Sequence, residues 1–315
     1  MRVIGIAWAE SSPRLNDIIN EIGGQSILIS WMRGMKILAP IRYALLAIKT
    51  LLLSIRYKPD IIIAQNPPIF CPLSVYVYTK LFKKKFVIDH HSLSIVKKGL
   101  LWKIISLIEL WLMKRSLINI VIHEGYEKLC KKIGVNSITI FDAIPEIPHE
   151  RKKLSKFTII SPLGGHPDED ISTLTELAKI LKNENIRLII TGRIKKNSNR
   201  IIGYVGYLPK DKYVQLLSMS HIGICLIKDN NWTLPYVIFE FIGAQIPFLI
   251  TKTPVTMLFG DFFLISKKED ILKKLLLFKD QNIYIKSLKL LENLKNILQN
   301  KRKVAINNFK TYILQ

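Results

Sequence analysis

Residues 229–251 read Asp-Asn-Asn-Trp-Thr-Leu-Pro-Tyr-Val-Ile-Phe-Glu-Phe-Ile-Gly-Ala-Gln-Ile-Pro-Phe-Leu-Ile-Thr, and this stretch is decisive for the fold. A short polar loop ends at Leu234 and Pro235, and Pro235 suits the first position of a helix, where its missing N–H costs nothing. An apolar helical turn follows, Gly243 lets the chain reverse, and Pro247 starts a strand. A loop, a helix and a strand in this order are typical of an open α/β sheet.

Glu240 is the one acidic residue of that apolar helix, and it follows a strand expected near 223–227 and its loop. Open α/β sheets bind ligands at the carboxyl ends of their strands. A carboxylate there can accept hydrogen bonds from the ribose hydroxyls of a sugar nucleotide. Spacing alone fits a partly exposed surface acid equally well.

The bulk composition favours a folded chain of two domains. The chain has 315 residues, of which 49% are apolar, and this excludes a disordered protein. We expect no signal peptide, because residues 2–7 read as a strand, and no spanning helix, because the most apolar stretch, 37–55, carries Arg42 and Lys49. Three scattered cysteines fit a reducing compartment and form no metal pattern.

The formal net charge of +23 suggests a polyanionic partner, which can be nucleic acid, anionic lipid or a phosphate-bearing substrate. A lysine- and isoleucine-rich composition without functional meaning explains the charge as well. No RNA-recognition signature or zinc-finger pattern accompanies it, so we expect no specific nucleic-acid partner.

Strand and helix patterns alternate along the whole chain. Six strands are expected in the first half, at 2–7, 26–30, 60–64, 85–89, 119–123 and 137–141. Six more are expected in the second half, at 157–161, 187–191, 203–206, 221–227, 248–251 and 262–265. The prediction is an α/β protein with two Rossmann-like, doubly wound domains of parallel strands that face a cleft.

We place the first domain at 1–150, the second at 151–300 and a helical tail at 301–315, which is expected to pack back on the first domain. The charged, proline-containing segment 145–156 reads as the linker.

Two segments of the first domain are unusually apolar for surface helices. Arg42, Lys49 and Arg56, in and directly after 36–55, are seven residues apart, so they line one helix face. The segment 100–113 carries Trp102 and Trp111 among aliphatic residues. Lysines and an arginine bracket the second segment at 97–98 and 114–115. These segments can be core helices that cover the sheet, or helices that lie in the interface of an anionic membrane.

Polar clusters follow two strands of the first domain. Gln65 and Asn66 come before two prolines, and Asp89, His90 and His91 end the next strand. Side chains at strand ends face the ligand site of such a sheet, and a histidine or carboxylate there can act as general base toward an acceptor hydroxyl. A simple chain break at the prolines and a helix-capping role for Asp89 fit the pattern too.

Ser12, Pro13 and Arg14 follow the first strand and open a helix. Free N–H groups at the helix start, together with Arg14, can bind a phosphate, and an ordinary serine cap gives the same pattern.

Glycine and basic residues follow strands of the second domain. Gly164 and Gly165 can let the backbone approach a phosphate, and Arg193, just past a strand and a glycine, suits a diphosphate. The acids at 168–170 match an Asp-x-Asp metal motif, but we interpret them as ordinary carboxylates at a helix start. Lys195 and Lys196 read as a solvated loop.

Together these segments resemble the GT-B glycosyltransferases, and more narrowly the branch that contains chitobiosyldiphosphodolichol β-mannosyltransferase and related family 4-like enzymes. The segments that carry the resemblance, in chain order, are 12–14, 65–68, 88–91, 167–170 and 234–247. Gln-Asn-Pro-Pro followed some twenty residues later by Ile-Asp-x-His is the most specific of them.

The resemblance implies transfer of a sugar such as mannose from a GDP- or UDP-linked donor to a lipid-linked acceptor. It implies work at the cytoplasmic membrane face by a peripheral protein, without a metal or other cofactor. It places Asp89 and His91 at the reacting centre. Donor contacts are implied for Glu240 at the ribose, Arg193 at the phosphates, and for Gly164, Gly165, Leu234 and Tyr236, and acceptor or phosphate contacts for Ser12, Arg14, Gln65 and Asn66.

The sequence departs from this pattern in three places, one of which is His90, where the eukaryotic enzymes carry an aromatic residue. The family's membrane anchor is missing, so surface attachment would replace it. Retaining GT-B enzymes carry a second glutamate eight residues before the position of Glu240, where this chain has Trp232, and this favours inversion. Two other functions stay open: transfer to a soluble glycan or protein, and a non-enzymatic basic α/β module that binds nucleic acid.

Overall fold

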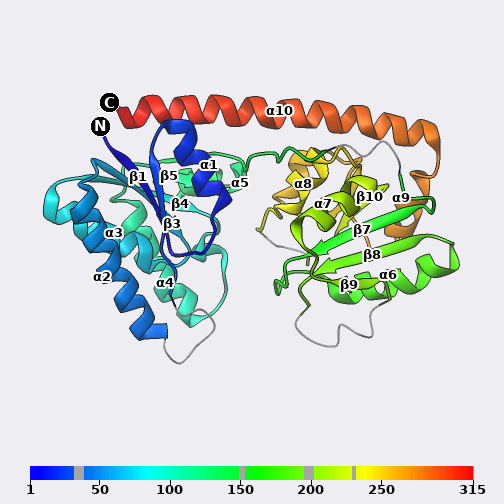
Figure 1. Cartoon of the computed structure of the whole chain (residues 1–315), viewed down its shortest axis with the longest axis horizontal. Coiled ribbons are helices and arrows are strands. Elements are labelled where there is room, and N and C mark those ends of the chain that lie inside the picture. Colours follow the sequence, from blue (N-terminus) through cyan, green and yellow to red (C-terminus); the bar gives the residue numbers. More distant parts are fainter. Residues whose placement is uncertain (32–38, 149–152, 195–201, 229–231, 315) are drawn as a thin grey trace. The chain divides into compact units, whose positions relative to one another are not determined.

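The computed structural model describes residues 1–31, 39–148, 153–194, 202–228 and 232–314 (Figure 1). The chain divides into two compact units, one made of Met1–Ala143 with Asn300–Gln315 and the other of Ile144–Gln299. Each unit holds one parallel sheet of six strands with helices packed around it. The expected loop residues 229–231 and the lysines at 195 and 196 lie outside the described residues.

The sheet of the first unit has the strand order β2-β1-β3-β4-β5-β6. Its strands are β1 (Val3–Ala7), β2 (Gln25–Leu28), β3 (Ile61–Asn66), β4 (Lys85–His90), β5 (Asn119–Val121) and β6 (Ser137–Thr139). Its helices are α1 (Pro13–Ile22), α2 (Ala39–Tyr57), α3 (Phe70–Phe82), η1 (Ser94–Val96), α4 (Leu100–Met113) and α5 (Glu124–Lys132). The winding direction reverses between β1 and β3, so the loops after these strands border the switch point where such sheets bind ligands.

The sheet of the second unit has the order β12-β11-β10-β7-β8-β9, and its winding reverses between β7 and β10. Its strands are β7 (Thr158–Leu163), β8 (Arg187–Gly192), β9 (Tyr204–Gly206), β10 (Ile222–Cys225), β11 (Phe248–Thr251) and β12 (Leu264–Ile265). Its helices are α6 (Ile171–Asn183), α7 (Lys210–Met219), α8 (Val237–Gly243), η3 (Thr256–Phe259) and α9 (Asp270–Leu277), and α10 (Gln281–Leu314) begins there. This is the strand order of dinucleotide-binding Rossmann domains.

The predicted α/β fold and all twelve predicted strands are confirmed, with ends that differ by a few residues. The reason is visible in β1 and β3, whose apolar runs are buried throughout. Strands covered by helices on both faces need continuous apolar runs, and Val and Ile also favour the extended backbone.

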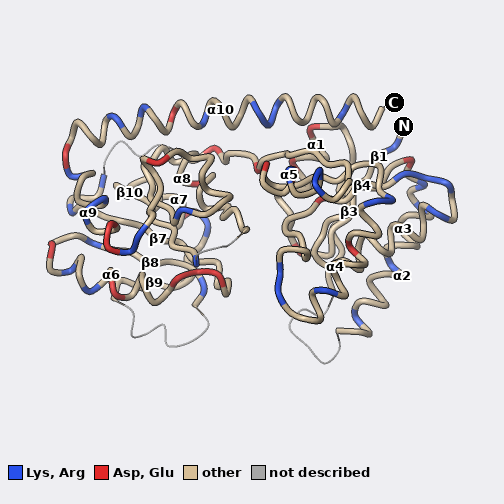
Figure 2. Tube along the Cα trace, turned by 180° about the vertical axis from the view of Figure 1, so that it is seen from behind, with Lys and Arg blue, Asp and Glu red and all other residues tan. Residues whose placement is uncertain are grey.

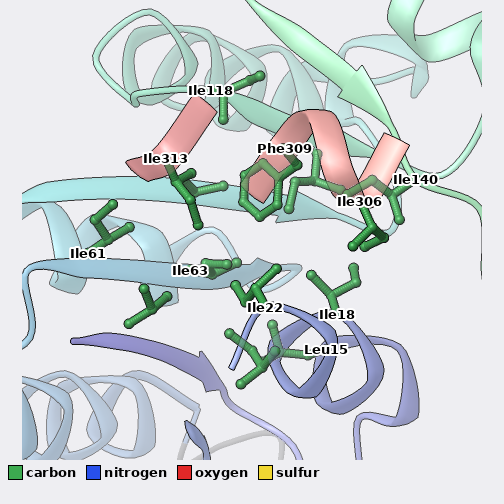
Figure 3. Packing of buried hydrophobic residues seen from close by; sticks show 14 of the residues in the cluster. Leu15, Ile18, Ile22, Ile61, Ile63, Ile118, Ile140, Ile306, Phe309 and Ile313 are labelled. Carbon is green, nitrogen blue, oxygen red and sulfur yellow. The ribbon is translucent and has the colours of Figure 1, made fainter. Parts of the chain in front are cut away.

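The last turns of α10 complete the core of the first unit (Figure 3). Ile306, Phe309 and Ile313 pack into the same cluster as Leu15 and Ile63, and Phe309 is fully buried. Nearby, Arg302 is buried and pairs with Glu21 of α1 and with the carbonyl of Phe141.

The turn around α8 differs from the sequence prediction in two details. Helix α8 starts at Val237, so Pro235 precedes the helix instead of opening it. The reversal falls at Gln245, whose φ is 49°, while Gly243 ends the helix. Gly243 is needed for a different reason, because a Cβ there would lie 2.2 Å from the carbonyl oxygen of Pro145.

Basic residues occur on helices and loops of both units and along α10 (Figure 2). None of the helices within the described residues is long and apolar enough to cross a membrane.

Candidate functional site

A cavity of about 640 Å³ opens at the carboxyl ends of β7, β8 and β10 in the second unit. This is the switch point of the sheet, where the winding reverses. The loops after β7, β8, β9 and β10 and the start of α8 line the cavity. Its size suits a ligand as large as a nucleotide sugar, since small-molecule sites span roughly 300–1,000 Å³.

Glu240 and Tyr213 form a hydrogen-bonded polar pair in the wall of this cavity. The Tyr213 hydroxyl, from α7, donates a 2.6 Å hydrogen bond to Oε2 of Glu240. Burial raises the pKa of Glu240, and the Tyr213 hydrogen bond opposes this rise. Burial and the neighbouring carboxylate raise the pKa of Tyr213, so its hydroxyl stays a donor. The carboxylate is therefore held in one orientation at the cavity wall.

Cationic and aromatic groups also line the cavity. Arg193 follows β8, and its guanidinium lies 5.5 Å from the ring centre of Tyr207, in the loop after β9. Lys210 opens α7 and lines the same cavity. Two positive side chains and a flat ring in one cavity are suited to a ligand that carries both phosphates and a base.

The loop between β7 and α6 holds a ring of backbone donors. The N–H groups of Gly164, Gly165 and His166 all donate to the carboxylate of Glu169. Asp170 caps α6 by accepting from the N–H of Thr173 at 3.1 Å, and although burial alone would raise its pKa, hydrogen bonds lower it to about 2. The helix-start interpretation therefore holds for Asp170, whereas Glu169 turns back onto the loop.

The cavity brings together most of the donor residues predicted from the sequence. Gly164, Arg193, Leu234, Tyr236 and Glu240 all line it, and Gly165 lies beside it in the adjoining depression under the same loop.

Sequence reasoning missed Tyr207, Lys210 and Tyr213, which also line the cavity. The signal that could have found Tyr207 and Lys210 is their place just after the strand expected at 203–206, at the same sheet edge as the other loops. Nothing in the local sequence singles out Tyr213 within its helix.

In the first unit, Asp89 and His91 follow β4 and form a hydrogen-bonded pair. Nε2 of His91 lies 3.2 Å from Oδ2 of Asp89, and the imidazole is 33% exposed whereas Asp89 is fully buried. Burial alone would raise the pKa of Asp89, but Arg14 and His91 hold it well below its usual range. An ionised buried carboxylate thus orients a histidine that solvent can reach, which is the arrangement of a general base and its partner.

Arg14 lies in the interior of the first unit, and its contact with a phosphate stays a prediction. Its side chain is 5% exposed and pairs with Asp89 at 3.0 Å and with Asp142 at 2.9 Å. The two carboxylates hold the guanidinium beside Asp89, while its Nη2 is buried without a hydrogen-bond partner among the described residues. Ser12 is also buried and donates to the side-chain oxygen of Gln65, 2.5 Å away.

Asn66 belongs to a buried network and not to an open surface. Its side-chain nitrogen lies 2.5 Å from Oε1 of Glu109 and 3.1 Å from Nδ1 of His90. Glu109 comes from α4 and also accepts from the backbone and the hydroxyl of Ser94. Its pKa falls below the usual value, because hydrogen bonds from His90 and Ser94 outweigh the effect of burial. The amide of Asn66 is thus engaged inside the unit in this structure, and its contact with an acceptor stays a prediction.

Within the described residues, no group of three or more histidines, cysteines, aspartates or glutamates is placed to hold a metal ion. The cysteines at 71, 130 and 225 are buried free thiols.

Comparison with solved structures gives matches over the whole chain. Anabaena HepE, solved in complex with UDP-glucose, has a TM-score of 0.73 at 12% identity, covering 100% of this chain and 99% of that chain. Sucrose-phosphate synthase from Thermosynechococcus elongatus has a TM-score of 0.73 at 10% identity, with the same two coverages of 100% and 99%. A glycosyltransferase from Rickettsia africae has a TM-score of 0.66 at 14% identity, covering 99% and 97%.

No protein-family model matches the sequence, and no curated protein matches it. At these identities the structural likeness establishes the fold. This chain has the two-domain α/β fold of the GT-B glycosyltransferases.

Proposed function

We propose that the protein is a glycosyltransferase whose second unit binds a nucleotide-sugar donor. The observation that carries the proposal is the cavity at the switch point of the second sheet, with the Glu240–Tyr213 pair on its wall. The likeness to HepE, whose structure holds UDP-glucose, supports the same ligand class.

Each part of the cavity meets one part of such a donor. Glu240 accepts hydrogen bonds from the ribose hydroxyls while Tyr213 fixes its orientation. Arg193 and Lys210 neutralise the diphosphate, and Tyr207 supplies a face for stacking. Arg193 and Lys210 stabilise the negative charge of the departing diphosphate, so no metal ion is needed for this purpose. We therefore expect sugar transfer to continue when metal ions are removed by a chelator.

In the first unit, His91 acts as the base for inverting transfer. With Nε2–H donating to Asp89, the other ring nitrogen, Nδ1, accepts the proton of the acceptor hydroxyl. The hydroxyl oxygen then bonds to the anomeric carbon while the bond from that carbon to the donor diphosphate breaks. Arg14 contributes indirectly, because it keeps Asp89 ionised.

The acceptor proposed is a lipid-linked one, reached from an anionic membrane surface at the cytoplasmic face. The support is the set of exposed aliphatic and aromatic residues on α2 and α4, two helices that both contact α3, which together we call the apolar surface. Its members are Ile41, Leu45, Ile48, Leu52 and Ile55 of α2, and Leu100, Leu101, Ile104, Leu107 and Trp111 of α4.

Helix α2 has its polarity inverted relative to an ordinary surface helix. Thr50 and Ser54 are fully buried, whereas Leu52 is 62% exposed. Lys49 and Arg56 are exposed on the same helix, which adds attraction to anionic lipid. A contiguous exposed apolar stripe flanked by bases is typical of a surface that contacts membranes.

The donor is tested by a thermal-shift screen of UDP, GDP and their sugars, including UDP-glucose and GDP-mannose, followed by transfer assays with lipid diphosphate acceptors. A ligand that binds only the folded state raises the midpoint of unfolding. Mannose rests on the sequence resemblance alone, so the screen decides between the two donor classes. If no member of the panel stabilises the protein, is transferred or is hydrolysed, the proposed activity is ruled out.

The acceptor class is tested by flotation with vesicles of anionic and of neutral lipid at physiological salt. We expect the protein to float with anionic vesicles. Transfer to soluble glycans by a protein that stays unbound would instead assign a soluble acceptor.

A further inference from the structure

Three consecutive backbone N–H groups of the β7–α6 loop point at a single carboxylate of the same chain. The nitrogen of Gly164 lies 2.6 Å from Oε1 of Glu169, and the nitrogens of Gly165 and His166 each lie 3.1 Å from Oε2. Gly165 has a φ of +79°, which lets the successive N–H groups face the same side. Such a cradle of main-chain donors is an anion-binding site, and here the anion that it binds is the carboxylate of Glu169 from the same chain.

The cradle belongs to the cavity described above. Gly164, His166 and Glu169 line that cavity together with Arg193. The loop and the residue after β8 are packed closely, since a Cβ on Gly165 would lie 3.1 Å from the carbonyl oxygen of Arg193. The main-chain donors and an arginine therefore border the same space, which is the combination that binds phosphates.

The backbone beneath Glu169 is fixed, although its side chain has rotatable bonds. Residue 169 forms a bridge with Ile227, and the N–H of Lys228 donates to the carbonyl of Asp168 at 2.8 Å. The carboxylate can thus leave the cradle by side-chain rotation alone, without unfolding the loop.

We propose that this cradle is the diphosphate site of the donor and that Glu169 is its internal occupant, which an incoming diphosphate displaces. The inference rests on the proposed function and adds a gate to it. Two anions cannot share three N–H donors, so binding must expel Glu169. A diphosphate forms more charge-assisted hydrogen bonds than the carboxylate does, whereas a weak anion does not outcompete it. Glu169 therefore sets a selectivity for highly charged phosphates.

The test measures binding of inorganic pyrophosphate, UDP, GDP, uridine and guanosine by calorimetry to the full chain and to the variants Glu169→Gln and Glu169→Ala. Removing the competing charge is expected to tighten pyrophosphate and nucleoside diphosphate binding about tenfold, which corresponds to the loss of roughly one charge-assisted hydrogen bond. Nucleoside binding is expected to stay unchanged. Glu176→Gln is the matched control, because it removes the same charge from an exposed position on α6 and is expected to change nothing.

Unchanged or weaker pyrophosphate and diphosphate binding in both folded Glu169 variants would overturn the proposal and make Glu169 a structural brace of the loop. The near-isosteric Glu169→Gln guards against a variant that fails to fold. The inference and the proposed function fail separately. If the Glu169 variants bind pyrophosphate more tightly but no nucleotide binds, the cradle proposal is supported and the donor function is contradicted. If nucleotides bind equally well to the parent chain and the Glu169 variants, the donor function is supported and the cradle proposal is contradicted.

Discussion

Glu240 shows how a single residue gains its role from a neighbour that is distant in the sequence. The carboxylate is largely buried, which by itself favours the protonated acid, and Tyr213 offsets that cost with a hydrogen bond. The pair presents an oriented acceptor to the cavity, and this is what a pair of ribose hydroxyls requires.

Replacing Glu240 with Ala is expected to weaken binding of the donor nucleotide by about 2 kcal/mol, because a charged acceptor of hydrogen bonds is lost. Tyr213→Phe keeps the carboxylate but frees its orientation, so a smaller loss of about 1 kcal/mol is expected. Calorimetry with the nucleotide found in the donor screen measures both. Unaltered affinity in Glu240→Ala would remove Glu240 from the site, and Tyr312→Phe, in the other unit, serves as the control.

Asp89 predicts a pH dependence of stability. Its folded pKa lies below its unfolded value of about 3.9, because Arg14 and His91 favour the ionised form. The stability that it contributes is therefore fully present above pH about 4 and is lost as the pH falls through the folded pKa. Denaturant titrations from pH 7 to 3 are expected to show a flatter acid limb in Asp89→Asn than in the parent chain.

The same variant leaves a buried arginine with one carboxylate fewer, so it is expected to unfold more easily by about 3 kcal/mol at pH 7. Asp261→Asn is the control, because that carboxylate is 89% exposed and its loss should leave the acid limb unchanged. Parallel acid limbs for Asp89→Asn and the parent would show that Asp89 is not the group that titrates.

At the level of elements, α2 buries hydroxyl groups and exposes aliphatic side chains, the reverse of an ordinary surface helix. Its buried face carries hydroxyls, and Thr50 accepts a 2.9 Å hydrogen bond from the indole of Trp8. Its exposed face carries the aliphatic residues of the apolar surface. A helix pays little to leave such residues in water one at a time, but a continuous stripe of them requires a partner.

Replacing Ile48 and Leu52 with Ser is expected to abolish flotation with anionic vesicles, because both side chains are about half exposed or more and lie on the apolar surface. Stability should change by less than about 0.5 kcal/mol, as for other surface changes. Ile180→Ser, on α6 of the other unit and 45% exposed, is the matched control and should float normally. Normal flotation of the double variant would place the membrane contact elsewhere.

The elements could be predicted from the sequence far better than the contacts within the site. Runs such as Ile61–Ile63 specify buried strands locally, and polar residues after a strand must meet at one sheet edge. The partners of Arg14 are distant in the sequence: Asp89 lies in β4 and Asp142 follows β6. A polar side chain close to a strand end does not reveal whether it faces the ligand or the interior.

Glu169 illustrates the same limit within a short loop. Carboxylates near a helix start usually serve the helix, and Asp170 does. The left-handed backbone at Gly165 is what redirects the N–H groups of the loop toward Glu169, and a Gly-Gly pair allows that conformation without requiring it.

For the molecule as a whole, α10 matters because its last turns belong to the first unit while its first turns belong to the second. The first unit is thus assembled from two separate parts of the chain. Phe309 lies at the centre of that joint core and is fully buried (Figure 3).

Phe309→Ala is expected to destabilise the first unit by about 3–5 kcal/mol, the usual cost of an emptied aromatic site in a core. Nucleotide affinity of the second unit should remain unchanged, because the cavity is lined by residues of the second unit whereas this cluster consists of residues of the first unit. Val304→Ala, at a site 52% exposed on the same helix, is the control and should be nearly neutral. A single destabilised transition beside an unaffected one in calorimetry would support the assignment.

The shared helix also has a consequence for biosynthesis. Residues 1–143 emerge from the ribosome first. The core of their unit is completed by Ile306, Phe309 and Ile313, which emerge only after Ile144–Gln299 has been synthesised. At a synthesis rate of roughly 5–20 residues per second, the first unit lacks these side chains for on the order of ten seconds, and the apolar residues that they cover stay exposed during that time. The second unit, although synthesised later, can finish folding first, so the order of maturation is expected to run against the order of translation, and the exposed apolar residues are a natural point for chaperone contact.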